Sequence, residues 1–268
     1  MPSWPTGVNW PTGVNWPTGV NGPPTIVNWP DSGGGPPPPT TPLTIFGAAS
    51  VLQWCRADLG VTVATGVSVW ADQSGNGKDY LQATAANQPA LTAVDATLNN
   101  LPTIGFDGVD DMMLAATLNF GLVAAAPICC LMIMKTTADL GHNMVLVGSG
   151  VDGGSHCVVY APNGASLNRY NGAVVLAATM ALNAWGRGRF EFSNSATDIG
   201  QFRANQNVNN AGNSAQGTGR AICAWNVSGS QWKGQFFEIA YLNKIPTPAE
   251  MTAYDAYVTA ITAGIAGV

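Results

Sequence analysis

The stretch Gln235-Phe-Phe-Glu-Ile-Ala-Tyr241 decides the fold class. It is a short apolar run rich in aromatic residues, which is typical of a strand buried in a sheet. Soon after it, Thr247-Pro-Ala-Glu250 has the pattern of a capping box with proline at the first helical position. We therefore expect one helix, from about Pro248 to Ala263, that turns an apolar stripe inward: Met251, Tyr254, Tyr257, Val258 and Ile261.

Short runs of the same kind recur upstream, and clusters of Gly, Asn, Asp and Ser separate them. Turn signals such as Ser74-Gly-Asn-Gly77, Pro162-Asn-Gly164 and Tyr170-Asn-Gly172 lie between the runs. This pattern predicts an all-β fold, an antiparallel β-sandwich of the jelly-roll type with one C-terminal helix. The expected strands are 61–63, 67–70, 103–106, 128–134, 144–147, 157–160, 173–176, 187–192, 222–225 and 235–241.

The N-terminus carries a repeat of six residues, Trp-Pro-Thr-Gly-Val-Asn, that begins at Trp4, Trp10 and Trp16 and recurs in degenerate form around Trp29. Six is a multiple of both the strand period and the polyproline II period, so an extended arm places these tryptophans along one edge. A disordered tail and a single coil of a β-helix are the alternatives. We divide the chain into an extended arm (1–30), a Gly/Pro linker (31–42) and a jelly-roll domain (43–268).

Charged residues make up only 9% of the 268 residues, and the formal net charge is −5. The basic residues are scattered singly, which argues against nucleic acid as a partner. Five cysteines without a CxxC pair indicate buried thiols in a reducing compartment. Neither a secretory signal nor a membrane span is apparent, so we expect synthesis and assembly in the host cytoplasm.

Several motifs carry a resemblance to a known superfamily. They are Trp70-Ala-Asp-Gln-Ser-Gly-Asn-Gly77, Asn87-Gln-Pro89, Leu101 to Asp111, and Trp232 to Asn243 with its capped helix. Over roughly residues 49–260 the chain resembles the concanavalin A-like lectin/glucanase superfamily, and within it the laminin-G-like domains of phage and bacterial surface proteins. The resemblance implies the sandwich fold, and leaves open whether the domain is a lectin, a glycosidase, an adhesion module or a virion part.

The aspartates in these motifs have two interpretations. Asp72, Asp107, Asp110 and Asp111 can each bond nearby backbone groups and so form tight turns, which is the interpretation we prefer. The alternative is a calcium site, since domains of this kind often bind calcium through loop oxygens. We otherwise expect no cofactor and no metal.

Candidate catalytic groups are few. Glu250 belongs to the helix cap, and neither Glu191 nor Glu238 has an acidic neighbour two or four positions away in its own strand. His142 and His156 are the only histidines. We therefore expect a protein that is not an enzyme, with no catalytic residue.

Function is then a choice among three hypotheses. The first is a virion structural protein, such as a capsid decoration protein, head fibre or tail appendage, which the arm anchors to other virion proteins through Trp4, Trp10, Trp16 and Trp29. The second is a carbohydrate-binding adhesion module, with Tyr170 and Trp185 as candidates for stacking on a sugar, whereas Trp225 and Trp232 are expected in the core. The third is a glycoside hydrolase. We expect a virion location and a homo-oligomer.

Overall fold

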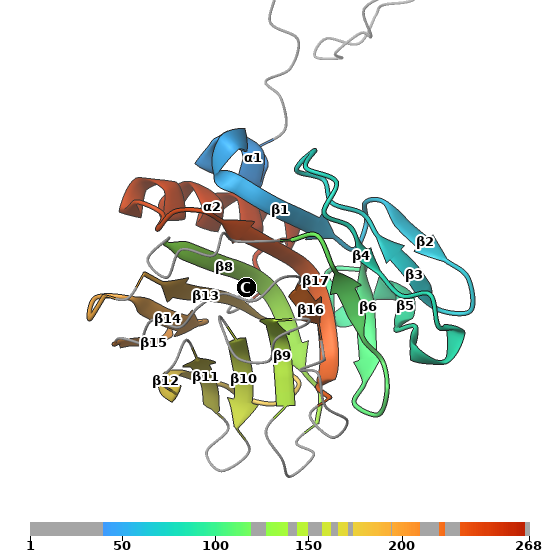
Figure 1. The fold of residues 1–268 in the computed structure, drawn as a ribbon. Helices are drawn as coiled ribbons and strands as arrows, with labels where there is room; N and C mark the ends of the chain where they lie inside the picture. The colour runs from blue at the N-terminus through green and yellow to red at the C-terminus, as the bar shows by residue number, and fades with distance from the viewer. Residues whose placement is uncertain are drawn as a thin grey trace, which may run out of the picture. The chain divides into compact units, whose positions relative to one another are not determined.

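The computed structural model describes residues 40–118, 127–138, 144–149, 157–161, 166–170, 174–193, 195–209, 220–222 and 231–265. In these parts of the chain it is an antiparallel β-sandwich of two sheets, with one long helix near the C-terminus (Figure 1). The predicted fold class is confirmed. Residues 1–30, and with them the four tryptophans of the predicted arm, lie outside the described residues.

The first sheet holds the centre of the fold. Its strands are β1 (Val51–Arg56), β5 (Ala90–Asp95), β6 (Leu101–Asp107), β8 (Ile128–Thr136), β13 (Gly186–Phe192), β14 (Ile199–Phe202), β15 (Asn205–Val208) and β17 (Lys233–Leu242). They run in the order β15-β14-β13-β8-β17-β6-β5, and β1 pairs with the C-terminal part of β17. Every residue of β8 is buried, as its continuous apolar sequence requires in a strand covered on both faces.

The second sheet packs against one face of the first. Its order is β12-β11-β10-β9-β16-β7-β4-β3-β2. The strands are β2 (Val61–Val63), β3 (Val67–Trp70), β4 (Tyr80–Leu81), β7 (Met113–Ala115), β9 (Met144–Ser149), β10 (Cys157–Ala161), β11 (Ser166–Tyr170), β12 (Val174–Thr179) and β16 (Arg220–Ile222). Each expected strand coincides with or overlaps one of the observed strands, and β1, β4, β5, β7, β11, β14 and β15 were not expected.

Aromatic side chains fill the space between the sheets. Trp232 lies 4.8 Å from Phe236 between ring centroids, and its indole N–H donates to Thr136 at 2.9 Å. Trp70 and Tyr80 are fully buried. The prediction that Trp232 belongs to the core is confirmed, whereas Trp225 lies outside the described residues. Cys55, Cys129 and Cys130 are buried thiols that form no disulfide, as expected.

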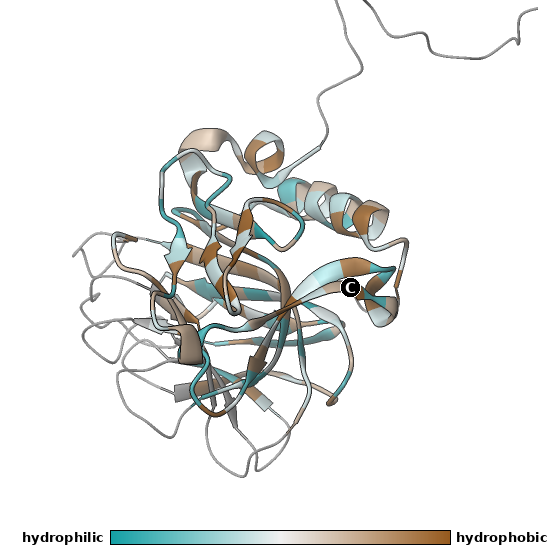
Figure 2. Ribbon diagram, turned by 90° about the vertical axis from the view of Figure 1, so that its right-hand side faces the viewer, coloured by the Kyte–Doolittle hydropathy of each residue, from teal (hydrophilic) through white to brown (hydrophobic). Residues whose placement is uncertain are grey.

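The helix α2 (Pro248–Ile261) packs on the first sheet, where Tyr254 contacts Glu238 of β17 (Figure 1). Hydrophilic and hydrophobic residues alternate along its ribbon (Figure 2). The capping box is present: Thr247 Oγ1 accepts the N–H of Glu250, whose carboxylate accepts the N–H of Thr247 at 2.8 Å. Met251, Tyr254, Tyr257 and Val258 are buried. In the part of the chain that the structure describes, no helix is long and apolar enough to cross a membrane.

Four short helical turns complete the described chain. They are α1 (Pro42–Phe46), η1 (Ala48–Ser50), η2 (Ala85–Asn87) and η3 (Ala96–Leu98). α1 packs on the C-terminal helix, since the ring of Phe46 lies 5.6 Å from that of Tyr254. Lys244 also donates to the carbonyl of Phe46 at 2.8 Å. The segment that leads into the first strand is therefore held by the last helix.

The turn after β3 closes the free edge of β1. Asp72 Oδ1 accepts the N–H of Trp54 at 3.0 Å, and the N–H of Gln73 donates to the carbonyl of Trp54. Asn76 Nδ2 donates to the carbonyl of Val51 at 2.9 Å. Gly75 and Gly77 take positive φ angles of 86° and 63°, which glycine adopts without strain. Residues 72–77, which belong to the first motif quoted for the resemblance, thus bond to one edge of β1. We call this turn the clip.

Asparagine side chains join the two sheets at one end of the sandwich. There the edge strands β12 and β15 lie against each other. The amide groups of β15 and of the residue after it donate to backbone carbonyls of β12, so the outward carbonyls of this edge are satisfied without a further strand. The bonds run from Asn205 to Thr179 (3.0 Å), from Asn207 to Ala177 (3.3 Å) and from Asn209 to Leu176 (2.8 Å).

Candidate functional site

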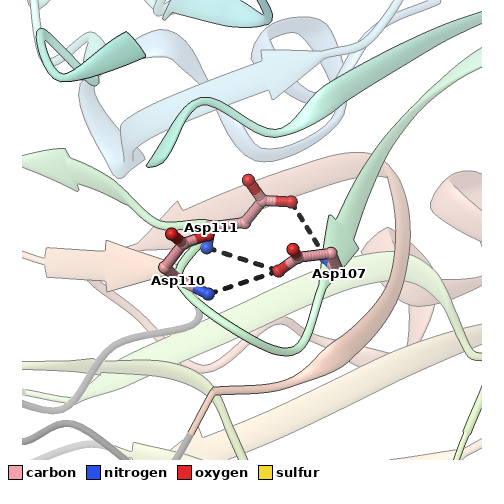
Figure 3. A group of neighbouring side chains, drawn as sticks. All are labelled: Asp107, Asp110 and Asp111. Carbon is pink, nitrogen blue, oxygen red and sulfur yellow. Dashed lines mark hydrogen bonds between the residues drawn. The ribbon is translucent and has the colours of Figure 1, made fainter. Parts of the chain in front are cut away.

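The loop between β6 and β7 brings together three of the four predicted aspartates (Figure 3). Each of Asp107, Asp110 and Asp111 offers a carboxylate oxygen, and these oxygens lie within 4.8 Å of one another. Asp107 and Asp110 are exposed, whereas Asp111 is only 7% exposed. This is the one acidic cluster with metal-ligand spacing among the described residues.

Hydrogen bonds within the loop already hold its shape. Asp107 Oδ1 accepts the N–H of Val109 at 2.8 Å and of Asp110 at 3.3 Å, and Asp111 Oδ2 accepts the N–H of Asp107 at 2.9 Å (Figure 3). Carboxylates are the hard oxygen donors that calcium prefers, so the ligand chemistry fits that ion, which would need further oxygens from carbonyls or water. The geometry also agrees with the turn interpretation, because the backbone donors of the loop are satisfied by its own carboxylates.

The pKa of Asp111 lies above the ordinary value of an aspartate. Burial and the neighbouring charges of Asp107 and Asp110 raise the pKa of the Asp111 carboxyl to about 6, although the N–H of Asp107 favours the ionised form. A cation at this point would therefore stabilise the ionised cluster. Without one, Asp111 becomes protonated at mildly acidic pH.

Asp72 does not belong to this cluster. Its Oδ1 accepts the N–H groups of Trp54 and Ser74, and its Oδ2 accepts the N–H of Lys78 at 3.0 Å and the hydroxyl of Ser74 at 2.8 Å. Both carboxylate oxygens are thus occupied by the clip on β1. The grouping of Asp72 with the other three aspartates as ligands of one calcium ion is corrected, because its lone pairs serve the backbone elsewhere.

Glu238 lies under the C-terminal helix, where it is fully buried. Its Oε1 accepts the hydroxyl of Tyr254 at 2.8 Å, and its Oε2 accepts the hydroxyl of Tyr257 and the indole N–H of Trp54 at 3.2 Å. Burial raises the pKa of the Glu238 carboxyl, while these three donors favour its charged form. The carboxylate of Glu238 on β17 thus links this strand to β1 and to α2.

Glu191 is also buried, on the same face of the first sheet. Register places Glu191 opposite Cys129 and Glu238 opposite Ile133, and these two positions lie on one face of β8. The carboxylate of Glu191 pairs with Arg189 and accepts the N–H of Ile199 at 2.7 Å. Both glutamates thus hold parts of the fold together.

Trp185 lies in the interior, contrary to its expected role as an open surface for a sugar. Only 4% of it is exposed, its indole N–H donates to Thr97 at 2.9 Å, and the ammonium of Lys135 lies 4.8 Å from its ring centroid. Lys135 is itself 7% exposed and pairs with Asp95 at 3.6 Å. Covered in this way, Trp185 has no free face for a pyranose. The contacts among Thr97, Lys135 and Trp185 could not be predicted from the sequence, because these residues lie far apart in the chain.

Tyr170, the other predicted sugar-stacking residue, ends β11, and its side chain lies outside the described residues. The anchoring tryptophans Trp4, Trp10, Trp16 and Trp29 also lie outside them. The structure places none of these five side chains.

Comparison with known proteins identifies the fold and not the family. The sequence matches no protein-family model, and no curated protein matches it. Among solved structures, Trypanosoma rangeli sialidase in complex with sialic acid aligns with a TM-score of 0.55 at 11% identity, over 79% of this chain and 33% of the sialidase. The receptor-binding domain of botulinum neurotoxin C/D mosaic serotype aligns with a TM-score of 0.56 at 7% identity, over 78% of this chain and 51% of that domain.

A third match spans a whole domain. Domain 4 of AbnA, a GH43 extracellular arabinanase from Geobacillus stearothermophilus, was solved in complex with arabinotriose. It aligns with a TM-score of 0.52 at 13% identity, over 80% of this chain and 98% of that domain. At such identities the likeness shows the fold alone. The chain spans about a third of the sialidase, so the match does not extend over that whole protein.

These matches correct the expectation that the chain is not an enzyme, because sialidases and a domain of an arabinanase share its β-sandwich. That expectation rested on the spacing of acidic residues within single strands. A sheet can also bring carboxylates from different strands to one face, and the spacing within a single strand does not reveal this. Glu191 and Glu238 are such a pair. The chain is a two-sheet β-sandwich, a fold that it shares with a sialidase solved with sialic acid and with an arabinanase domain solved with arabinotriose.

Proposed function

We propose that the sandwich is a carbohydrate-binding domain. The observation that supports this proposal most is the alignment over 98% of an arabinanase domain that was solved with a bound arabino-oligosaccharide. The sparse charge of the chain is compatible with it, since the polar surface must then be built largely from Asn, Gln, Ser and Thr.

The distribution of aromatic residues narrows the position of the sugar site. Sugar rings stack on exposed aromatic faces, and every aromatic side chain that the structure describes is buried. In the sandwich, a stacking surface must then come from aromatic side chains outside the described set, which are Phe120, Tyr160, Tyr170 and Trp225. We propose Tyr170, which ends β11 and is followed in the sequence by Asn171-Gly172, a pair that predicts a turn.

Titration of the full chain with a panel of neutral and acidic oligosaccharides, followed by calorimetry, tests the proposal. We expect saturable binding of at least one member and its loss in Tyr170→Ala. The matched control is Leu176→Ala on the adjacent strand β12, where an apolar side chain is 41% exposed. Absence of binding across the panel would contradict the proposal. Release of reducing sugar from a bound member would add hydrolysis to binding.

A second, more specific proposal concerns the assembly to which the domain belongs. We propose that it is displayed on a virion as a decoration protein, head fibre or tail appendage, assembled in the host cytoplasm and joined to the particle by residues 1–30. The repeated tryptophans support this, because each ring can bury about 200 Å² against a partner. Deleting residues 2–30, or replacing Trp4, Trp10 and Trp16 by Ala, should abolish incorporation into particles. Normal incorporation of both variants would refute the anchoring role.

A further inference from the structure

The edges of the two sheets differ. On the second sheet, the amide side chains of Asn205, Asn207 and Asn209 occupy carbonyls of the edge strand β12. On the first sheet, the edge strand β5 pairs with β6 alone, and among the described residues no strand lies along its outer edge. Unpaired N–H and C=O groups on such an edge are a template for an added strand.

The first five residues of β5 contain no lysine or proline that would block this edge. Natural edge strands are usually blocked by lysine or proline, and the run from Ala90 to Val94 contains neither, nor any charge. Val94 is 63% exposed, and Leu91 is a partly buried side chain at the rim of the core. Ala90, Leu91 and Thr92 keep a regular register with β6 before a bulge. The available edge is therefore short.

The N-terminal repeat has the complementary pattern. In an extended strand, consecutive N–H groups point to opposite edges and consecutive side chains to opposite faces. Between residues 4 and 21, every proline has an odd number (Pro5, Pro11 and Pro17), whereas every even position keeps its N–H. One edge would then be complete and the other interrupted by proline. The even positions also place Trp, Thr and Val on one face, and the odd positions place Pro, Gly and Asn on the other.

We propose that the six-residue units of the arm of one copy add as strands to the β5 edge of other copies. The complete even-numbered edge would pair with β5, and the proline-bearing edge would face outward and stop further strand addition. A tryptophan on the face shared with Leu91 would cover the rim of the core. This proposal rests on the assembly role proposed for the arm and names its partner as the chain itself.

Length argues for several partners of one arm. Residues 4–21 would span about 60 Å as a strand, whereas the six residues of β5 span about 20 Å at 3.3 Å per residue. One β5 edge thus accommodates about one unit, and three units offer places for up to three copies. Residues 1–30 and the run from Ala90 to Val94 carry no charged side chain, so no like charges oppose the pairing.

Sedimentation of the full chain over a range of concentrations provides the test. We expect reversible self-association that weakens at least tenfold when Val8, Val14 and Val20 are replaced by proline, because these changes interrupt the even-numbered edge. The matched control replaces Gly7, Gly13 and Gly19 by proline, which adds the same number of prolines to the edge already interrupted. Equal effects of the two sets would overturn strand addition.

A second pair of variants tests the edge on the domain. Val94→Lys should weaken association at least tenfold, whereas Val208→Lys, at a position 53% exposed on the edge strand β15 at the other end of the sheet, should not. Unchanged circular dichroism and melting in both variants would show that the domain remains folded. A chain that stays monomeric at all concentrations, or an association indifferent to Val94→Lys, would refute the proposal. If such a chain still enters particles through its arm, the anchoring role stands with a different partner.

Discussion

Replacing Asp72 by alanine should destabilise the domain by about 3 kcal/mol. The carboxylate accepts four hydrogen bonds, from the N–H groups of Trp54, Ser74 and Lys78 and the hydroxyl of Ser74. A hydrogen bond to a charged group contributes about 1.5 to 3 kcal/mol, but the bonds here share one acceptor and the turn is half-exposed, so the sum is much smaller than four independent bonds. The largest part comes from Trp54, whose N–H loses its partner at the edge of β1.

Urea unfolding followed by tryptophan fluorescence measures this change in the free energy of unfolding. In a domain of this size, 3 kcal/mol corresponds to a fall in Tm of about 6 to 12 °C. Asp58→Ala is the control, since its partly exposed ion pair with Arg56 should contribute about 1 kcal/mol or less. A loss below about 0.5 kcal/mol in Asp72→Ala would refute the role of this turn as a clip on β1.

Four further changes have defined outcomes. Glu238→Gln should cost about 2 kcal/mol in urea unfolding, because an amide cannot accept from three buried donors, and equal stability would contradict the network under α2. Because the pKa of Asp111 is raised to about 6, the free energy of unfolding should fall as pH rises from about 4 to 6. Asp111→Asn should remove this dependence from a plot of Tm against pH and leave the pH dependence outside that range unchanged. Thr247→Ala should cost about 1 kcal/mol, and no loss would mean that the cap does not hold the helix. Chelation of calcium should leave the Tm nearly constant, and a fall of about 10 °C or more would make Asp107, Asp110 and Asp111 ligands.

Strands with a local pattern could be predicted from the sequence, whereas strands made by distant partners could not. The run from Val67 to Trp70 is β3 with the expected ends, because a short apolar run between turn signals indicates a strand, and both of its end residues are buried. In contrast, β15 consists of Asn205, Gln206, Asn207 and Val208, which have low strand propensity apart from valine. Its backbone pairs with the adjacent strand β14, and its amide side chains bond carbonyls on β12, some thirty residues away along the chain, a contact that no local pattern shows.

The same distinction applies to the candidate site. The aspartates of the loop after β6 lie within five residues of one another, so their proximity was predictable. The burial of Trp185 was not, because Thr97 and Lys135, which enclose it, come from other strands and turns. Nor does a sequence show that Glu191 and Glu238 share a face, since that depends on which strands are neighbours of β8.

The pairing of β1 with β17 has a consequence for synthesis of the protein. Trp54 and Glu238 are in contact although 184 residues separate them in the chain. At about 5 to 20 residues per second, a ribosome needs about 10 to 40 s to deliver the second of these strands after the first. During that interval the nascent chain exposes β1 without its partner, and only the turn at residues 72–77 is already available to cover one edge of it. The clip is thus the first protection that the opening strand receives on the ribosome.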